Sequence, residues 1–265
     1  MKKYIATIKI EWQRALTYRA DTLGFRLGNF FEIMIQIVIW TAIFEKNSSI
    51  GGYSYPEMIT YILIGWLISL LTANFGFEYT ISRQIQQGEL SNYTTKPFDY
   101  IKYIIALSIG RASTALAAAF LMNILLIALF SRYIIFSHSI FSWLIIISMI
   151  LVGYFIKLFI SVLTGFIAFW TIDISGVFYS VNLFSKFLAG NYFPLSLLPL
   201  IFVKFSFALP FIYTFYFPVQ LYLGKLSITE GLRGLGIEII WLGALYFLTR
   251  SLWKLGLKKY ESVGI

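Results

Sequence analysis

The stretch that decides the fold class is Ile140 to Trp170, IFSWLIIISMILVGYFIKLFISVLTGFIAFW. It contains a single charged residue, Lys157, and is long enough to cross about 30 Å of bilayer hydrocarbon as a helix. The rest of the chain has the same character, because 59% of its 265 residues are hydrophobic, 19% are aromatic and only 12% are charged. A soluble domain usually carries charge on about a quarter of its residues, so this composition excludes a water-soluble fold.

Five more apolar stretches are long enough to span a bilayer: residues 22–44, 57–79, 103–130, 174–193 and 236–253. We therefore expect an all-α membrane protein, a single transmembrane domain over residues 1–265 with six transmembrane helices. The segment Leu195 to Phe217 is also apolar, but prolines at 194, 199, 210 and 218 oppose a continuous helix. We expect an external re-entrant helical hairpin there, between helices five and six, within residues 194–233.

The distribution of positive charge supports six spans. With a cytoplasmic N-terminus, thirteen of the 21 Lys and Arg lie inside and five outside, in keeping with the positive-inside tendency. A seventh span would place Lys254, Lys258 and Lys259 outside. The net charge of +9 then suits contact with anionic membrane lipid; the basic residues are too dispersed to indicate a nucleic-acid partner.

Residues 1–21 are expected to form an interfacial helix. Apolar side chains recur there at steps of three and four residues, and most of the basic side chains fall on the other face. Lys9, Trp12 and Arg14 are its candidate functional residues. A plain membrane anchor and a docking helix are both compatible with this pattern.

The sequence lacks the motifs of an enzyme. No G-x-x-x-x-G-K-[ST] phosphate loop occurs, so we expect no ATP to be bound by this route. There is no cysteine, and the single histidine, His138, has no second ligand nearby, so we expect it to be a loop residue. We expect no catalytic residue, no metal and no bound cofactor.

The longest polar interruption is Ser82 to Asp99, SRQIQQGELSNYTTKPFD, on the cytoplasmic side of the predicted topology. Residues 83–87 favour a short helix, Gly88 is suited to end it, and Pro97 stops the chain before the third span. A surface helix of this kind is either a simple connector or a contact site for a partner.

This segment, as QGELSNYTTKPFDY, resembles the cytoplasmic coupling segment of type-2 ABC exporter permeases, in the viologen-exporter-like branch. Other stretches resemble the same branch in the same order along nearly the whole chain. They are Ala168-Phe169-Trp170, Gly190 to Leu195 with Leu198-Pro199, Leu223 to Ser227, and the ending Leu252-Trp253-Lys254 to Lys259-Tyr260-Glu261 with Gly264.

The resemblance implies a permease subunit of an ABC exporter in a bacterial plasma membrane, multi-pass, with both termini cytoplasmic. It implies a second permease chain, identical or a sister, and separate ABC ATPase subunits that bind the ATP and Mg²⁺. Coupling to the ATPase is expected through the following positions of the polar segment: Gln86, Gly88, Glu89, Leu90, Ser91 and Tyr93.

Charges inside spans are costly unless they are paired or hydrated, so Glu32, Lys157 and Lys186 are expected to face the bundle interior, either in structural pairs or along a pathway. Glu32 is taken as the only acid well inside a span and as a partner for either lysine. Arg111 is expected to snorkel to the inner interface. In the aromatic hairpin, Phe211 and Phe215 are expected to form an external gate.

Two other functions compete with an ABC permease. An ATP-independent secondary transporter would show inverted repeats and midplane acids, and no clear repeat is present. A membrane-embedded assembly factor is a third possibility. The sequence leaves small hydrophobic drugs, cationic dyes, peptides and lipid-linked molecules all open as the transported substrate. The aromatic faces of the expected hairpin also suit cationic or amphipathic substrates.

Overall fold

The computed structural model describes residues 2–74, 76–94, 99–136 and 139–260. Predictions made for Lys96, Pro97, His138, Glu261 and Gly264 lie outside these ranges. The described chain is helical, and its only β-type pairing is an isolated bridge between Ile50 and Tyr53. The α-helices are α1 (Lys2–Thr17), α2 (Arg19–Phe44), α3 (Tyr55–Leu71), α4 (Phe77–Gln86), α5 (Ser91–Thr94), α6 (Tyr100–Phe130), α7 (Ile140–Phe166), α8 (Ser175–Ala189), α9 (Leu200–Phe207), α10 (Tyr216–Tyr222) and α11 (Ile228–Lys259).

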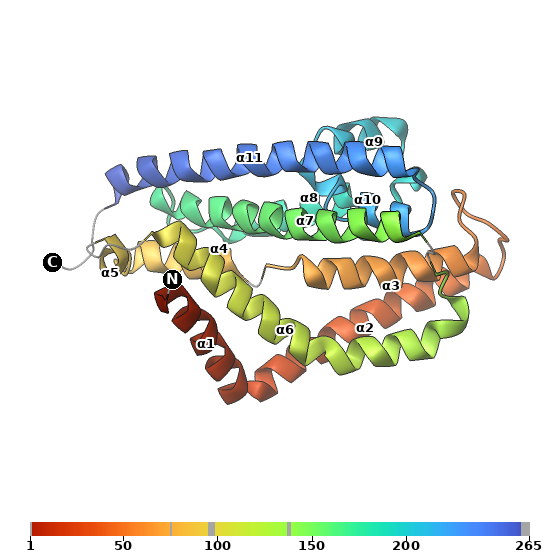
Figure 1. The fold of residues 1–265 in the computed structure, drawn as a ribbon, viewed down its shortest axis with the longest axis horizontal. Helices are drawn as coiled ribbons and strands as arrows, with labels where there is room; N and C mark the ends of the chain where they lie inside the picture. Colours follow the sequence, from red (N-terminus) through yellow and green to blue (C-terminus); the bar gives the residue numbers. More distant parts are fainter. Residues whose placement is uncertain (1, 75, 95–98, 137–138, 261–265) are drawn as a thin grey trace.

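The long helices run roughly along the longest axis of the molecule (Figure 1). Helix α11 packs along α7, α1 packs along α6, and α4 packs against α7. The beginning of α1, the end of α11 and the α4–α5 segment lie at one end of the bundle, which we call the coupling end (Figure 1). The connection between α2 and α3 lies at the opposite end, with the one between α10 and α11.

Three helical segments within the described residues are long and apolar enough to cross a membrane: Tyr100–Phe120, Ile140–Phe169 and Ile228–Lys259. The pair Leu200–Phe207 and Pro210–Tyr222 would add a fourth if it is one span, but it is bent by 88°. Helices α2 and α3 contribute shorter apolar segments. The chain is therefore an all-α, multi-pass membrane protein. The count of six spans and the re-entrant hairpin stay predictions, because an 88° bend fits a broken span as well as a re-entrant loop.

Two predicted span boundaries were wrong. The stretch 57–79 is not one helix, because α3 ends at Leu71 and α4 starts at Phe77 after Gly76, whose φ of 68° is left-handed. The last span begins at Ile228, before the predicted Gly236. Ser227 and Glu230 form a capping box there, which satisfies free N–H groups of the first turn.

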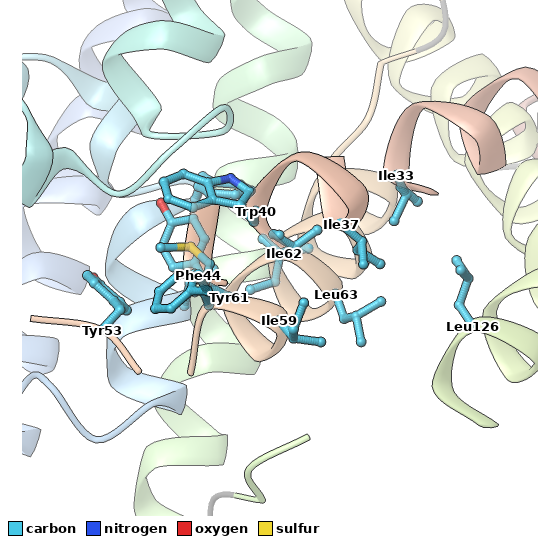
Figure 2. Close-up of a cluster of buried hydrophobic side chains, with 14 of the residues drawn as sticks. Ile33, Ile37, Trp40, Phe44, Tyr53, Ile59, Tyr61, Ile62, Leu63 and Leu126 are labelled. Atoms are coloured by element: carbon cyan, nitrogen blue, oxygen red, sulfur yellow. The ribbon is translucent and has the colours of Figure 1, made fainter. Parts of the chain in front are cut away.

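The largest hydrophobic core fills the space between α2 and α3. Ile33, Ile37 and Trp40 follow one another at helical spacing along α2 and face Ile62 and neighbouring residues of α3 (Figure 2). The opposite face of α2 is exposed, as expected for a helix with lipid on one side. This packing fixes α2 and α3 as one wall of the interior described next.

Candidate functional site

A cavity of about 1040 Å³ lies inside the bundle, and we call it the central cavity. Helices α2, α3, α6, α7 and α8 contribute to its walls, together with the segment Phe211 to Phe215 that precedes α10. Its volume is in the range of sites that enclose small ligands. All five predicted pathway or gate residues line it: Glu32, Lys157, Lys186, Phe211 and Phe215.

Lys157 and Lys186 enter the cavity from neighbouring helices, α7 and α8. The Lys157 ammonium donates a hydrogen bond to Thr72 Oγ1 at 2.8 Å. Its charged neighbours are Lys186 and Glu238. Lys186 is in the last turn of α8, where the helix dipole favours a positive charge. Neither ammonium forms a salt bridge with a carboxylate among the described residues.

Glu32 does not pair with either lysine, contrary to one of our expectations. Its side chain is exposed on α2, on another wall of the cavity, and it forms no ion pair with a described residue. The positions of these residues along the sequence and within their spans do not show which walls of the bundle carry Glu32 and the two lysines.

Glu238 is a second acidic residue well inside a span, since it lies far from both ends of α11. The prediction that Glu32 is the only such acid was therefore wrong. Its side chain is 0% exposed on α11, and neither carboxyl oxygen has a hydrogen-bond partner among the described residues. It lies against α7, because a Cβ placed on Gly153 would come within 3.1 Å of Glu238 Oε1 and 3.3 Å of Thr214 Cβ. Gly153 is one turn before Lys157 on the same face of α7, so the carboxyl group lies about one turn along that helix from the lysine. Glu238 is not among the described residues that line the cavity.

Phe211 and Phe215 occupy different environments at the hairpin side of the cavity. Phe215 is 2% exposed, its ring is edge-on to Tyr61 at 5.9 Å, and it packs directly over Gly65. A Cβ at Gly65 would come within 2.5 Å of that ring, so this position requires glycine. Phe211 is only partly buried. Of the two, Phe211 has more freedom to move.

The cavity also carries uncharged polar groups. Asn74 has its side-chain oxygen and nitrogen buried without a hydrogen-bond partner in the described part of the chain. Asn191 donates to Ser69 Oγ at 2.9 Å. Aromatic rings supply apolar wall, among them Trp66 and Phe178. The interior therefore combines cationic and polar groups with an apolar surface.

Helix α1, predicted to be an interfacial helix, contacts α6 through an ion pair and a hydrogen bond. Arg111 Nε donates to Glu11 Oε2 at 3.1 Å, and Glu11 is only 7% exposed. Arg111 is thus paired with a carboxylate 100 positions away in the sequence, and it also lines the cavities. The expectation that it snorkels to the inner interface stays a prediction. Trp12 Nε1 donates to Ser113 Oγ at 2.9 Å, whereas Lys9 and Arg14 are exposed.

The predicted coupling residues form a compact turn between α4 and α5. Gly88 has a φ of 74°, in the left-handed region where glycine is least strained. Leu90 is 0% exposed and packs in a cluster with Ile85 and Tyr100, whereas Gln86 is exposed and donates to the Ile172 carbonyl. The remaining three positions are at least partly exposed: Glu89, Ser91 and Tyr93.

The start of α6, where Tyr100 packs with Leu90 and Tyr93 of this turn, is joined to the last helix by two contacts. The ring of Tyr100 stacks on Trp253 of α11 at 4.7 Å, and Arg250 donates to Asp99 Oδ2 at 2.9 Å. Partial burial raises the pKa of Asp99, but the Lys102 amide and the Arg250 guanidinium outweigh it and hold that pKa below its ordinary value. The coupling end is therefore a packed unit.

A second cavity, of about 880 Å³, lies at the coupling end between α1, α4, α6 and residues 172–175. It shares wall residues with the central cavity: Arg14, Gly76, Tyr79, Arg111 and Thr114. The two spaces adjoin, so the hollow interior reaches the end of the bundle that carries the coupling turn. No group of three or more metal-ligating side chains occurs among the described residues.

The comparisons with known proteins agree with this architecture. A family model described as ABC-2 family transporter protein matches residues 30–264. The comparisons with curated proteins and with solved structures gave no match. The matched range includes the coupling turn, the central cavity and all helices from α3 to α11.

Proposed function

We propose that this chain, which belongs to the ABC-2 family of transporter proteins, exports its substrate with energy from ATP hydrolysed on a separate subunit. Membership of the family makes it a membrane permease of an ABC transporter. The direction of transport, the ATPase partner with its ATP and Mg²⁺, and a second permease chain are part of the proposal. The viologen-exporter-like branch is likewise proposed from the sequence motifs alone.

The observation that carries the proposal is the continuity between the central cavity and the coupling end. A protein driven by an external motor needs a contact site for the motor and a substrate space that this site can reshape. The coupling turn is exposed at Gln86 and packed at Leu90, and two of the elements that hold it, α4 and α6, also line the central cavity. We propose that the turn and α1 face the cytoplasm and contact the ATPase.

The test is co-purification followed by transport. The full chain, expressed with an ABC ATPase and any second permease encoded beside it, is expected to retain the ATPase in mild detergent. Glu89→Lys is expected to abolish ATP-driven export while the chain still inserts in the membrane, because it reverses a charge on the contact turn.

Lys46→Glu, an equally drastic charge reversal at an exposed residue of the other end, is the matched control and should leave export unchanged. Export that persists in Glu89→Lys, or solute movement by the purified chain without any ATPase, would disprove the proposed coupling.

A further inference from the structure

We call the part of the central cavity that carries Lys157 and Lys186 the lysine wall, and neither lysine forms a salt bridge with a described residue. The two lysines are charged neighbours, and Lys157 also has Glu238 of α11 as a neighbour, which lies against α7 and is not among the described residues that line the cavity. With both lysines protonated, the three groups carry a net charge of +1 if Glu238 is ionised and +2 if it is not. Positive charge inside a membrane domain is costly unless it is paired or hydrated.

The geometry directs this charge into the cavity. The Lys157 ammonium donates to Thr72 Oγ1, a hydroxyl, and not to the Glu238 carboxylate, whose oxygens accept no hydrogen bond from described residues. Lys186 likewise has no carboxylate within salt-bridge distance in the described part of the chain. Both ammonium groups therefore keep donor capacity for a ligand.

The other charges of the cavity do not cancel this wall. Arg111 is paired with Glu11, and the lining acid Glu78 has Arg111 as its charged neighbour and accepts a hydrogen bond from Ser161. Glu32 lies on the α2 wall and pairs with neither lysine. The same cavity presents apolar rings at Trp66 and Phe178, so it offers a positive pole and an aromatic surface together.

We infer that the central cavity binds an amphipathic anion, whose acidic group is held by Lys157 and Lys186 and whose apolar part lies against the aromatic wall. This inference rests on the proposed function, since it names the class of substrate that the permease moves. The attraction is strong at this place, because opposite charges interact more strongly away from bulk water.

The test is a binding measurement on the full chain in nanodiscs of phosphatidylcholine, a lipid without net charge. The probes are pyrenebutyrate and pyrenebutyl-trimethylammonium, which share a ring and a spacer and differ in the sign of the head group. Fluorescence titration is expected to show the carboxylate probe binding at least tenfold more tightly. Decyl phosphate is expected to displace it, because the acidic group and not the pyrene is recognised.

Lys157→Gln and Lys186→Gln are each expected to weaken pyrenebutyrate binding about tenfold, without weakening binding of the cationic probe. Lys186→Arg keeps the positive charge and is expected to bind pyrenebutyrate as the wild type does. Lys204→Gln, at an exposed lysine of α9 outside the cavity wall, is the matched control. Size-exclusion profiles equal to the wild type, together with the Lys186→Arg rescue, separate loss of the site from loss of folding.

Equal binding of the two probes, tighter binding of the cation, or an anion preference that survives in the Lys157→Gln, Lys186→Gln double variant would overturn the inference. Transport separates the two proposals. Selective anion binding without ATP-dependent movement contradicts only the export function. ATP-dependent export of other molecules without anion selectivity contradicts only the substrate class.

Discussion

At the scale of one residue, Glu238 is a buried acid that the sequence analysis did not predict. Three of the charges inside apolar stretches, Glu32, Lys157 and Lys186, were predicted to face the interior, and all line the central cavity. Glu238 was missed because the last span was expected to start at Gly236, which would put the acid at an interface. The capping box Ser227 to Glu230 was the available signal, since it starts the helix two turns earlier.

The buried carboxyl group of Glu238 leads to a stability prediction. Glu238→Met is expected to raise the melting temperature by a few degrees, because it replaces an unpartnered buried polar group, which costs about 1–3 kcal/mol, by an apolar one of similar length. Thermal unfolding followed by tryptophan fluorescence measures it. Glu32→Met removes an exposed acid and should change little; a large loss in Glu238→Met would mean that the carboxylate is paired.

The two predicted gate residues should respond differently to truncation. Phe215→Ala is expected to lower stability by about 3–5 kcal/mol, because Phe215 is buried against Tyr61 and Gly65 and its loss leaves a cavity. Phe211→Ala should cost markedly less. Unfolding midpoints of the two variants check this order, and equal losses would contradict it. Because Phe211→Ala is expected to stay folded, a change in its range of transported substrates would indicate that Phe211 acts as a gate.

At the scale of elements, α1 is held on α6 by packing, by the Trp12–Ser113 hydrogen bond and by one long-range ion pair. Amphipathic spacing predicted the helix, but nothing in residues 1–21 shows which helix it packs on. Glu11 finds Arg111 across 100 positions of sequence, and such pairing is set by tertiary packing and not by local pattern. The sequence therefore predicted the element and not its partner.

Breaking this pair should be more harmful than removing it. Arg111→Met is expected to destabilise the protein by about 3 kcal/mol, since it leaves the buried Glu11 with only the exposed Arg14, at 3.9 Å, as a counter-charge. The double variant Glu11→Met, Arg111→Met should recover most of that loss. Unfolding free energies in a double-mutant cycle measure the coupling. Additive losses would show that the pair contributes nothing to the attachment of α1.

The break between α3 and α4 was also invisible to hydropathy. Residues 57–79 are apolar on average, and that average predicts one long helix. In the structure α3 ends at Leu71 with Thr72 as its C-cap, and α4 begins only after Gly76, whose backbone is left-handed. This break places Thr72 against Lys157 and leaves Asn74 at the cavity. Part of the central cavity is therefore formed at the break between α3 and α4, which average hydropathy does not predict.

At the scale of the whole molecule, composition predicted the class and the family motifs predicted the kind of protein, whereas the crossing number depends on how α9 and α10 sit in lipid. The absence of cysteine makes topology directly measurable. Asn92→Cys and Lys258→Cys are expected to react with a membrane-impermeant maleimide only after the cells are opened, and Asn47→Cys in intact cells. All three positions are exposed.

Six crossings with both termini inside require that pattern. Labelling of Lys258→Cys on intact cells, with Asn92→Cys still protected, would indicate an odd number of spans and would make the bent pair a full crossing. Labelling of Asn92→Cys on intact cells would place the coupling turn outside and contradict the proposed ATPase contact.

Near its C-terminal end α11 is held by two contacts, Trp253 with Tyr100 and Arg250 with Asp99. Its N-terminal end lies beside the connection from α10, and Glu238 lies between the two ends of the helix. At 1.5 Å per residue its 32 residues extend about 48 Å. A rod of that length works as a lever: a tilt of roughly 5° about one end displaces the other by about 4 Å. A small tilt imposed at the coupling end would thus become a movement of side-chain size at the start of α11, beside its connection to α10.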